Sequence, residues 1–243
     1  MSAILVAEGV NKSFDAVTAA ADINLAFDRQ SVVSLIGANG AGKTTFLNMV
    51  TGYLTPNRGR IAFEGRDLVG LTPRAITRLG ISRSFQIPQL FQSLSVRENL
   101  LVAEAIAKAD NIEKATNAML AQFGLEPYAD QPAGLLPEGI RKLLDVAMAL
   151  VGEPKVLLLD EPTSGVAADE KFGIMDLVMG AARGADVMVL FVEHDMDIVS
   201  RYAGRVIAFY DGRVIADGCP RDVLAAAEVR RYVIGEGAPN AAA

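Results

Sequence analysis

Short apolar runs alternate with polar and glycine-containing segments over the first part of the chain. These runs predict strands at residues 4–10, 23–27, 32–36 and 60–63. From residue 95 the spacing of apolar positions becomes helical, and Ser95 with Glu98 has the pattern of a capped helix start. Helices are therefore expected at about residues 95–108, 110–123 and 138–152.

Strands and helices continue to alternate in the last part of the chain. Strands are expected at 156–160 and 186–192, helices at 168–181 and 195–202, and a hairpin at 206–209 and 214–216. Such alternation predicts an α/β fold in which helices cover both faces of a mostly parallel sheet. The sequence thus predicts a single domain over residues 1–243, with a core at 1–87 and 153–234, a helical subdomain at 88–152 and a flexible tail at 235–243.

A glycine-rich loop, GANGAGKT at residues 37–44, lies between an apolar strand and an apolar helix. Its glycines allow the backbone to turn tightly and to direct N–H groups at phosphate oxygens. Lys43 adds a positive charge, the helix that begins there adds its dipole, and Thr44 offers a hydroxyl to Mg²⁺. The loop therefore predicts a nucleoside triphosphate site formed by Gly37, Asn39, Gly40, Ala41, Gly42, Lys43, Thr44 and Thr45.

Two acidic residues and a histidine follow apolar strands further along the chain. Asp160 and Glu161 end the run at 156–160, and ligands bind at this end of strands in open α/β sheets. Asp160 is expected to hold Mg²⁺, directly or through water, and Glu161 to polarise an attacking water. His194 follows the next strand, where a neutral imidazole could contact a γ-phosphate. Lys43, Glu161 and His194 are therefore the candidate catalytic residues.

Two further residues are weaker candidates. Gln86 lies at the junction between the core and the helical subdomain, where a hinge could sense the nucleotide, and it joins Thr44 and Asp160 as a candidate metal ligand. Phe14 could stack on an adenine ring, or it could simply cover the edge of a sheet.

Composition narrows the class of partner. The formal net charge is −6, which argues against duplex DNA as a bulk electrostatic partner. The single cysteine, Cys219, rules out an internal disulfide and fits a reducing compartment. The first residues lack the charged start of a signal peptide, and no stretch approaches the ~18 apolar residues that a membrane-spanning helix needs.

The order of these motifs resembles the ATP-binding subunit of ABC transporters over about residues 4–234. Four segments are similar to the branched-chain amino acid importer group: RSFQIPQLF at 83–91, SVRENLLVA at 95–103, FVEHDMDIV at 191–199 and DGRVIADGCPRDV at 211–223. The resemblance implies a P-loop NTPase core with an antiparallel β subdomain and an inserted helical subdomain. It also implies that Glu161 is the general base, His194 the switch histidine, Gln86 the transmission-loop residue and 164–168 part of an interdomain loop.

The resemblance further implies hydrolysis of ATP with Mg²⁺ to power uptake of a branched-chain amino acid or a similar small solute. Two cassettes would pair head to tail, so that ATP on one P-loop is covered by the signature loop of the other. The expected partners are transmembrane permease subunits, a second ATP-binding subunit of the same or a different chain and, indirectly, a periplasmic solute-binding protein. The protein would lie in the cytoplasm, peripheral on the inner face of the plasma membrane, and no nucleic-acid partner is expected.

The signature loop departs from the family pattern. LSGGQ is expected, but the chain has Leu136, Pro137, Glu138, Gly139 and Ile140. Pro137 has neither the hydroxyl nor the N–H that a serine would offer the γ-phosphate, and Glu138 brings a like charge that Arg141 and Lys142 could partly offset. Either each ATP site of a heterodimer combines parts of two different chains, which is the preferred interpretation, or this signature is a working variant.

The sequence is also compatible with other functions. One is an ABC-type ATPase that acts on nucleic acid or the ribosome, although such proteins usually carry two cassettes, long coiled coils or zinc-binding cysteine pairs. Another is a poorly hydrolysing partner subunit of a heterodimer, against which the retained Lys43, Asp160, Glu161 and His194 argue. A small-molecule kinase would need an acceptor pocket and an arginine-rich lid, and neither is identifiable in the sequence.

Overall fold

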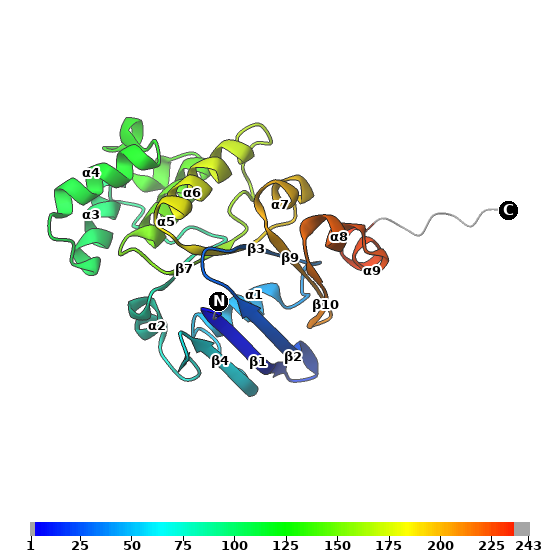
Figure 1. Cartoon of the computed structure of the whole chain (residues 1–243). Helices are drawn as coiled ribbons and strands as arrows, with labels where there is room; N and C mark the ends of the chain where they lie inside the picture. The colour runs from blue at the N-terminus through cyan, green and yellow to red at the C-terminus, as the bar shows by residue number, and fades with distance from the viewer. Residues whose placement is uncertain (1–2, 236–243) are drawn as a thin grey trace. The chain divides into compact units, whose positions relative to one another are not determined.

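The computed structural model describes residues 3–235, so positions 236–243 of the expected tail lie outside the described residues. The chain forms two compact units (Figure 1). One consists of the described parts of Met1–Leu79 and Leu190–Ala243, and the other of Gly80–Val189. The division into a core and a helical subdomain at 88–152 stays a prediction.

The first unit contains an antiparallel sheet in the order β2-β1-β4-β5. Its strands are β1 (Leu5–Phe14), β2 (Val17–Phe27), β4 (Arg58–Phe63) and β5 (Arg66–Asp67). Leu5 lies opposite both Phe27 and Phe63, and all three side chains are buried. β1 and β2 extend well beyond the predicted strands: the added part of β1 is largely polar at residues 11–13, and the added part of β2 contains three consecutive alanines at 19–21. Neither part gives the apolar pattern that predicts a strand.

The first unit also contains a glycine loop between a strand and a helix. β3 (Val32–Ile36) pairs in parallel with β9 (Arg205–Tyr210), which pairs antiparallel with β10 (Arg213–Gly218). α1 (Lys43–Val50) begins at the predicted residue, and its Phe46 ring lies 6.2 Å from Phe27 and 6.1 Å from Phe209. These fully buried rings fix α1 against both sets of strands.

Short helices complete the first unit. They are α2 (Pro73–Leu79), α7 (Met196–Tyr202), α8 (Pro220–Ala225), α9 (Ala227–Val229) and a π-helical turn at Arg230–Ile234. Of these only α7 was predicted. α8, α9 and the π-helical turn are too short to show a helical period, and α2, although as long as α7, buries only Ile76 and so has no apolar stripe.

The second unit is built on two parallel strands and a group of helices. β6 (Ile81–Ser84) pairs with β7 (Val156–Asp160), with Ile81 opposite Val156. The helices are α3 (Val96–Ala107), α4 (Ile112–Gln122), α5 (Glu138–Leu150) and α6 (Lys171–Gly184). Short 3₁₀ turns lie at Glu126–Tyr128 and Ala133–Leu135. β8 (Met188–Val192) begins in this unit and ends in the first.

The structure agrees with most of the predicted helices and strands of this unit and differs at the start of α6 and at β6. The predicted cap of α3 is confirmed: the Ser95 hydroxyl accepts the Glu98 N–H at 3.2 Å, and the Ser95 N–H donates to the Glu98 carboxylate at 2.7 Å. α6 begins at Lys171 rather than at residue 168, because residues 161–170 form turns. β6 was not predicted, since its alternating serines gave no continuous apolar run.

No helix within residues 3–235 is both long enough and apolar enough to cross a membrane.

Candidate functional site

The glycine loop passes very close to neighbouring backbone. Gly42 has a φ of +106°, and a Cβ placed there would lie 2.4 Å from the carbonyl oxygen of Ala19. A Cβ at Gly37, where φ is +155°, would lie 2.5 Å from the carbonyl oxygen of Phe209. Only glycine fits at these two positions, because any side chain would displace backbone that belongs to the surrounding strands.

The end of the loop presents several groups that suit a triphosphate. Gly42 is the N-cap of α1 and provides no side-chain cap. The N–H groups at the start of a helix favour an anion, such as a phosphate. The Lys43 ammonium donates to the carbonyl oxygens of Gly37 at 2.6 Å and Ala38 at 3.0 Å, which holds its charge against the loop. Thr44 is exposed in the first turn of the helix. This donor set fits the phosphates of a nucleotide and a hydroxyl ligand for Mg²⁺.

Asp160 ends β7 in the second unit and is almost completely buried. Its Oδ2 accepts a hydrogen bond from Arg83 at 2.6 Å, and the two side chains are only 3% and 5% exposed. Its Oδ1 is also buried and has no hydrogen-bond partner within the described residues. A buried carboxylate oxygen without a partner is costly, so this atom is suited to hold a cation or a cation-bound water.

The possible metal ligands in this region suit Mg²⁺ better than a metal ion that is coordinated only by protein side chains. Within residues 3–235, no three His, Cys, Asp or Glu side chains gather into a metal-binding group. Mg²⁺ commonly takes one or two carboxylates and completes its coordination with water and substrate phosphates. One carboxylate oxygen of Asp160 therefore matches this ion.

Gln86 and Glu161 contact one another beyond the carboxyl ends of β6 and β7. The Gln86 amide donates to the Glu161 carboxylate at 2.9 Å. Glu161 has a φ of +53°, a left-handed conformation that non-glycine residues seldom adopt. The structure therefore brings three of the predicted residues, Gln86, Asp160 and Glu161, to one end of two adjacent parallel strands.

Two residues of α5 that the sequence analysis did not select as site residues hold this region together. The Lys142 ammonium donates to the carbonyl oxygens of Glu161 at 2.7 Å and Gln86 at 3.3 Å. The Asp145 carboxylate accepts the backbone N–H groups of Phe85 and Gln89. One feature of the sequence could have indicated these two residues. They are charged and lie three residues apart, on a predicted helix whose other residues on that side are mostly apolar and expected to be buried. Arg83 was also missed, because nothing local to it indicates a partner.

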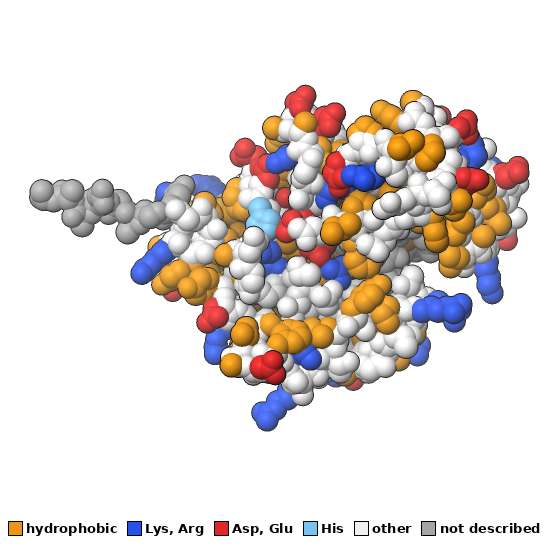
Figure 2. Space-filling model, turned by 180° about the vertical axis from the view of Figure 1, so that it is seen from behind, with side chains coloured by type: hydrophobic (Ala, Val, Ile, Leu, Met, Phe, Trp, Pro, Cys, Tyr) orange, Lys and Arg blue, Asp and Glu red, His pale blue; other side chains and the backbone are white. Residues whose placement is uncertain are grey.

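His194 lies in the first unit, two residues beyond β8, and its side chain is exposed. It is the single histidine of the chain and is coloured pale blue in Figure 2. Its backbone is fixed on both sides: its own N–H donates to the Glu193 carboxylate at 3.1 Å, and Asp195 caps α7 by accepting the Asp197 N–H at 3.1 Å. The exposed imidazole thus lies on a turn whose backbone is held by hydrogen bonds on both sides.

Phe14 lies at the hairpin end of β1 and is 46% exposed. The Lys12 ammonium lies 5.2 Å from the centre of its ring, a cation–π contact. An exposed ring is compatible with stacking on a base, and that role stays a prediction.

The signature loop leads directly into α5. Leu136 is buried, Pro137 is the N-cap, and Glu138 is the first helical residue. The Glu138 carboxylate forms an ion pair with Arg141, so its negative charge is offset within the same helical turn. A Cβ at Gly139 would lie 3.1 Å from the Ile174 side chain, which shows that α5 and α6 pack closely there. Ile140 is half-buried.

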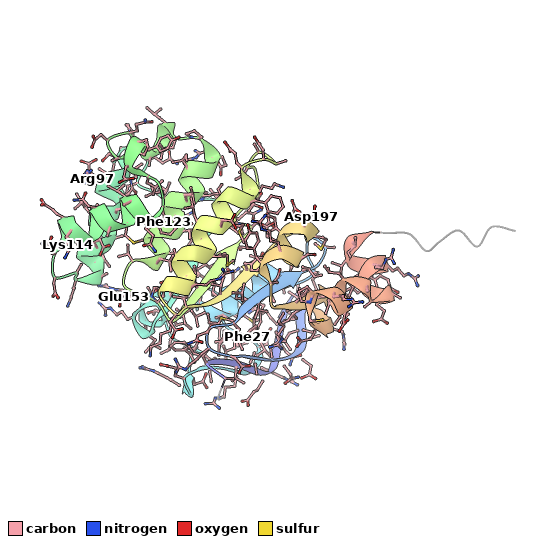
Figure 3. The ribbon with its side chains drawn as sticks, turned by 45° about the horizontal axis from the view of Figure 1, so that its top comes forward. Phe27, Arg97, Lys114, Phe123, Glu153 and Asp197 are labelled. Atoms are coloured by element: carbon pink, nitrogen blue, oxygen red, sulfur yellow. The ribbon has the colours of Figure 1, made fainter. Side chains whose placement is uncertain are left out.

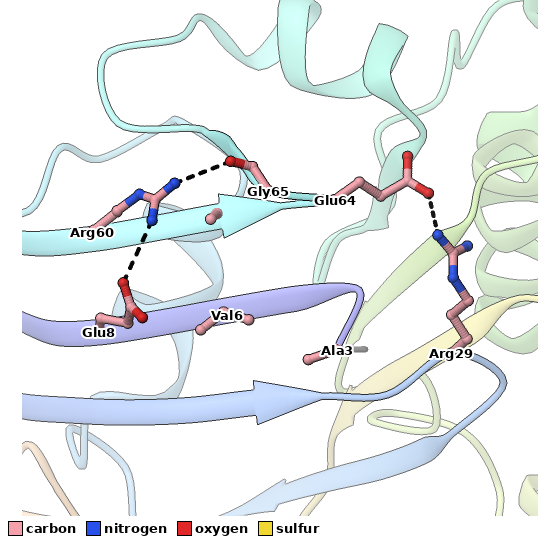
Figure 4. A pocket seen from close by; sticks show the side chains of 8 residues that line it. Ala3, Val6, Glu8, Arg29, Arg60, Glu64 and Gly65 are labelled. Carbon is pink, nitrogen blue, oxygen red and sulfur yellow. Dashed lines mark hydrogen bonds and ion pairs between the residues drawn. The ribbon is translucent and has the colours of Figure 1, made fainter. Parts of the chain in front are cut away.

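An open pocket of about 420 Å³ lies elsewhere in the first unit, on the antiparallel sheet (Figure 4). Four charged side chains that line the pocket form two ion pairs. The Arg29 guanidinium lies 2.5 Å from the Glu64 carboxylate, and the Arg60 guanidinium lies 3.7 Å from the Glu8 carboxylate, so the charges in the pocket neutralise one another. None of the predicted site residues lines this pocket. We therefore do not assign the nucleotide to it.

Comparison with known proteins gives matches over nearly the whole chain. The family model described as ABC transporter matches residues 20–164. The probable branched-chain amino acid transport ATP-binding protein LivG of Archaeoglobus fulgidus is 33% identical over 246 residues, which cover 96% of this chain and 95% of that protein. The high-affinity branched-chain amino acid transport ATP-binding protein BraF of Pseudomonas aeruginosa is 32% identical and covers 96% and 98% respectively.

A solved structure is also similar. The ADP conformation of MJ1267, an ATP-binding cassette of an ABC transporter, has a TM-score of 0.86 and 30% sequence identity to this chain. The match covers 97% of this chain and 100% of that one.

Proposed function

This chain belongs to the ABC transporter family as an ATP-binding cassette, and we propose that its hydrolysis of ATP powers the import of a branched-chain amino acid or a similar small solute. The predicted fold class, an α/β P-loop NTPase of the cassette type with an antiparallel sheet, is confirmed by the likeness to MJ1267. The full-length match to relatives named for branched-chain amino acid transport is the observation that supports this solute class. No relative described above supports the nucleic-acid alternative.

Nucleotide binding is assigned to the residues that the sequence motifs predicted. The N–H groups of the loop at 37–44 and the Lys43 ammonium would bind the phosphates, with Phe14 as a candidate for the base. The Thr44 hydroxyl and Asp160 Oδ1 would hold Mg²⁺, with Gln86 as a further ligand. Mg²⁺ would neutralise charge on the phosphate oxygens.

Hydrolysis is assigned to Glu161 and His194. The Glu161 carboxylate would accept a proton from a water molecule as the water oxygen attacks the γ-phosphorus and the bond to the leaving ADP oxygen breaks. The hydrogen bond from Gln86 holds that carboxylate in one orientation. His194 would contact the γ-phosphate from its anchored turn. The Gln86–Glu161 contact is the geometric observation that supports this assignment.

Glu161→Gln tests the role of the base. The variant keeps the size of the side chain but cannot accept the proton, so steady-state ATP turnover should fall by about 10²–10⁴-fold while ATP binding persists. Turnover is measured by phosphate release from the chain assembled with its transporter subunits. Glu153→Gln is the matched control, since Glu153 is an exposed residue of the second unit in the turn after α5 (Figure 3). Full activity in Glu161→Gln would contradict the assignment.

The remaining partners follow from the family. A cassette serves as one part of a transporter with membrane subunits, and we propose separate permeases on the cytoplasmic face of the plasma membrane, a second ATP-binding subunit and, indirectly, a periplasmic solute-binding protein. Uptake of labelled leucine into vesicles that carry the full complex tests the solute class. Uptake that persists when Glu161→Gln replaces the native chain, or a complex that moves only unrelated solutes, would contradict the proposal.

A further inference from the structure

Helix α5 buries two charged side chains on the side that faces the site of the second unit. Lys142 and Asp145 lie three residues apart and are 4% and 7% exposed. Burying a charged group is costly unless hydrogen bonds compensate it. Each of the two side chains should therefore be explained by what it contacts.

The Asp145 carboxylate holds the backbone on both sides of Gln86. Its Oδ2 accepts the N–H of Phe85 at 2.9 Å, and its Oδ1 accepts the N–H of Gln89 at 3.0 Å. Both oxygens are thus used, and the segment 85–89 is fastened at its two ends. Burial raises the pKa of Asp145 to about 6, while these hydrogen bonds and the charge of Lys142 act in the opposite direction.

The Lys142 ammonium joins the backbone of Gln86 to that of Glu161, the two residues whose side chains contact one another. It donates to the Glu161 carbonyl at 2.7 Å and to the Gln86 carbonyl at 3.3 Å. The Gln86 amide in turn contacts the Glu161 carboxylate at 2.9 Å. One side chain of α5 therefore determines the relative placement of Gln86 and Glu161.

We propose that Lys142 and Asp145 are positioning residues that couple the signature helix to the Gln86–Glu161 pair of the same chain. α5 begins at the signature loop and is continuous from Glu138 to Leu150, so a shift of its first turn moves both side chains together. A signature loop that docks on a partner cassette would then adjust the Gln86–Glu161 pair of its own chain. The inference rests on the roles proposed above for Gln86 and Glu161.

Hydrogen exchange on the full chain tests the contacts directly. Lys142→Met keeps the length of the side chain but removes its donors, and should accelerate exchange in peptides that cover residues 85–89 and 161–165 by about tenfold or more, with α3 and α4 unchanged. Asp145→Asn should accelerate exchange at 85–89 alone, because the NH₂ group that replaces one carboxylate oxygen cannot accept the N–H that this oxygen accepted. Unchanged exchange at these segments in either folded variant would overturn the proposal.

Matched controls come from the same unit. Lys114 is exposed on α4, as Figure 3 shows, and Asp110 is exposed before that helix. Lys114→Met and Asp110→Asn remove the same charges and should leave the exchange of residues 85–89 and 161–165 as in the native chain. Acceleration of similar size in these controls would mean that the segments respond to any loss of charge, and would also overturn the proposal.

Kinetics of the assembled transporter distinguish positioning from general destabilisation. Lys142→Met should lower kcat by about 10- to 100-fold, because a charge-assisted hydrogen bond to each of two carbonyls is lost, and leave KM for ATP within about threefold. Lys142→Arg retains a donor and should recover part of the lost kcat. If kcat of the folded Lys142→Met protein equals that of the native chain, the coupling is refuted. Hydrogen exchange tests the contacts of Lys142 and Asp145 even if Glu161→Gln shows that Glu161 is not the base, so the failure of one proposal can be distinguished from the failure of the other.

Discussion

Glu161 has an unusual backbone for its residue type, and this conformation has a consequence for the site. Its φ of +53° turns the chain directly after β7 instead of continuing the strand. Non-glycine residues in this conformation are strained by about 1–3 kcal/mol when the surroundings impose it. Here the Lys142 ammonium holds the Glu161 carbonyl and the Gln86 amide holds its carboxylate. At the scale of the residue, the fold thus retains a strained turn at the proposed base.

Asp145 should make folding stability depend on pH. Burial raises its pKa to about 6 from an ordinary 3.8, so between these values the folded chain binds the proton more tightly than the unfolded chain. Acidification from about pH 7.5 to about pH 5 should therefore stabilise the folded state through this group, and the gain is lost as pH rises through about 6. A shift of about two pKa units corresponds to at most about 3 kcal/mol.

Urea unfolding of the native chain and of Asp145→Asn at these two pH values checks this expectation. The variant lacks the titrating group, so its unfolding free energy should gain less on acidification than that of the native chain. Asp110→Asn should behave like the native chain. Equal pH dependence in Asp145→Asn and the native chain would show that burial does not shift this carboxyl.

At the scale of the element, helix starts fix the loops that precede them. α3 begins at Val96 with a complete capping box, and the hydrogen bonds to Ser95 lower the pKa of Glu98. Asn99, one turn into the same helix, is fully buried and accepts the Phe91 N–H while donating to the Phe91 carbonyl. The start of α3 therefore fastens the end of the loop that contains Gln86.

Removal of the cap should destabilise the protein without affecting the proposed chemistry. Ser95→Ala loses the acceptor for the Glu98 N–H and should lower the unfolding free energy by about 1 kcal/mol, measured by urea denaturation. Ser200→Ala, at an exposed position of α7, should change it by less than about 0.5 kcal/mol. The kcat of folded Ser95→Ala should stay near the native value. A variant as stable as the native chain would show that the cap contributes nothing.

At the scale of the whole molecule, we expect the signature loop to decide how two cassettes share their ATP sites. Pro137 lacks the donor groups of a serine, and the charge of Glu138 is already engaged by Arg141. Such a loop is poorly suited to complete a partner's site. The P-loop of this chain, in contrast, has the glycines and the lysine that phosphates require. We therefore expect an asymmetric dimer in which this P-loop forms the more active site with the signature of a different chain.

Lys43→Ala in the assembled complex tests this asymmetry. If this P-loop forms the main hydrolytic site, ATP turnover should fall by more than about tenfold, whereas two equivalent sites would leave about half of it. The purified chain alone should hydrolyse ATP only weakly. Strong activity of the isolated chain that Glu161→Gln abolishes would remove the asymmetric model.

A second experiment restores the family pattern of the signature loop, and turnover of the complex is then expected to rise rather than fall. Replacing Pro137 with Ser and Glu138 with Gly should activate the ATP site on the partner and raise turnover of the complex by up to about twofold, because two sites would then work instead of one. No increase in a folded, assembled complex would indicate that the native loop already functions.

Local patterns in the sequence determined the glycine loop, the apolar strands before it and before Asp160, and the cap of α3, because each of these depends on residues close together in the chain. The strand β6 and the helix α2 left too little periodicity to be predicted. Only the tertiary structure decided that Arg83 holds Asp160 across 77 positions and that Asp145 holds the backbone of Phe85 across 60. A buried charge requires a partner, but the sequence does not specify which distant segment provides it.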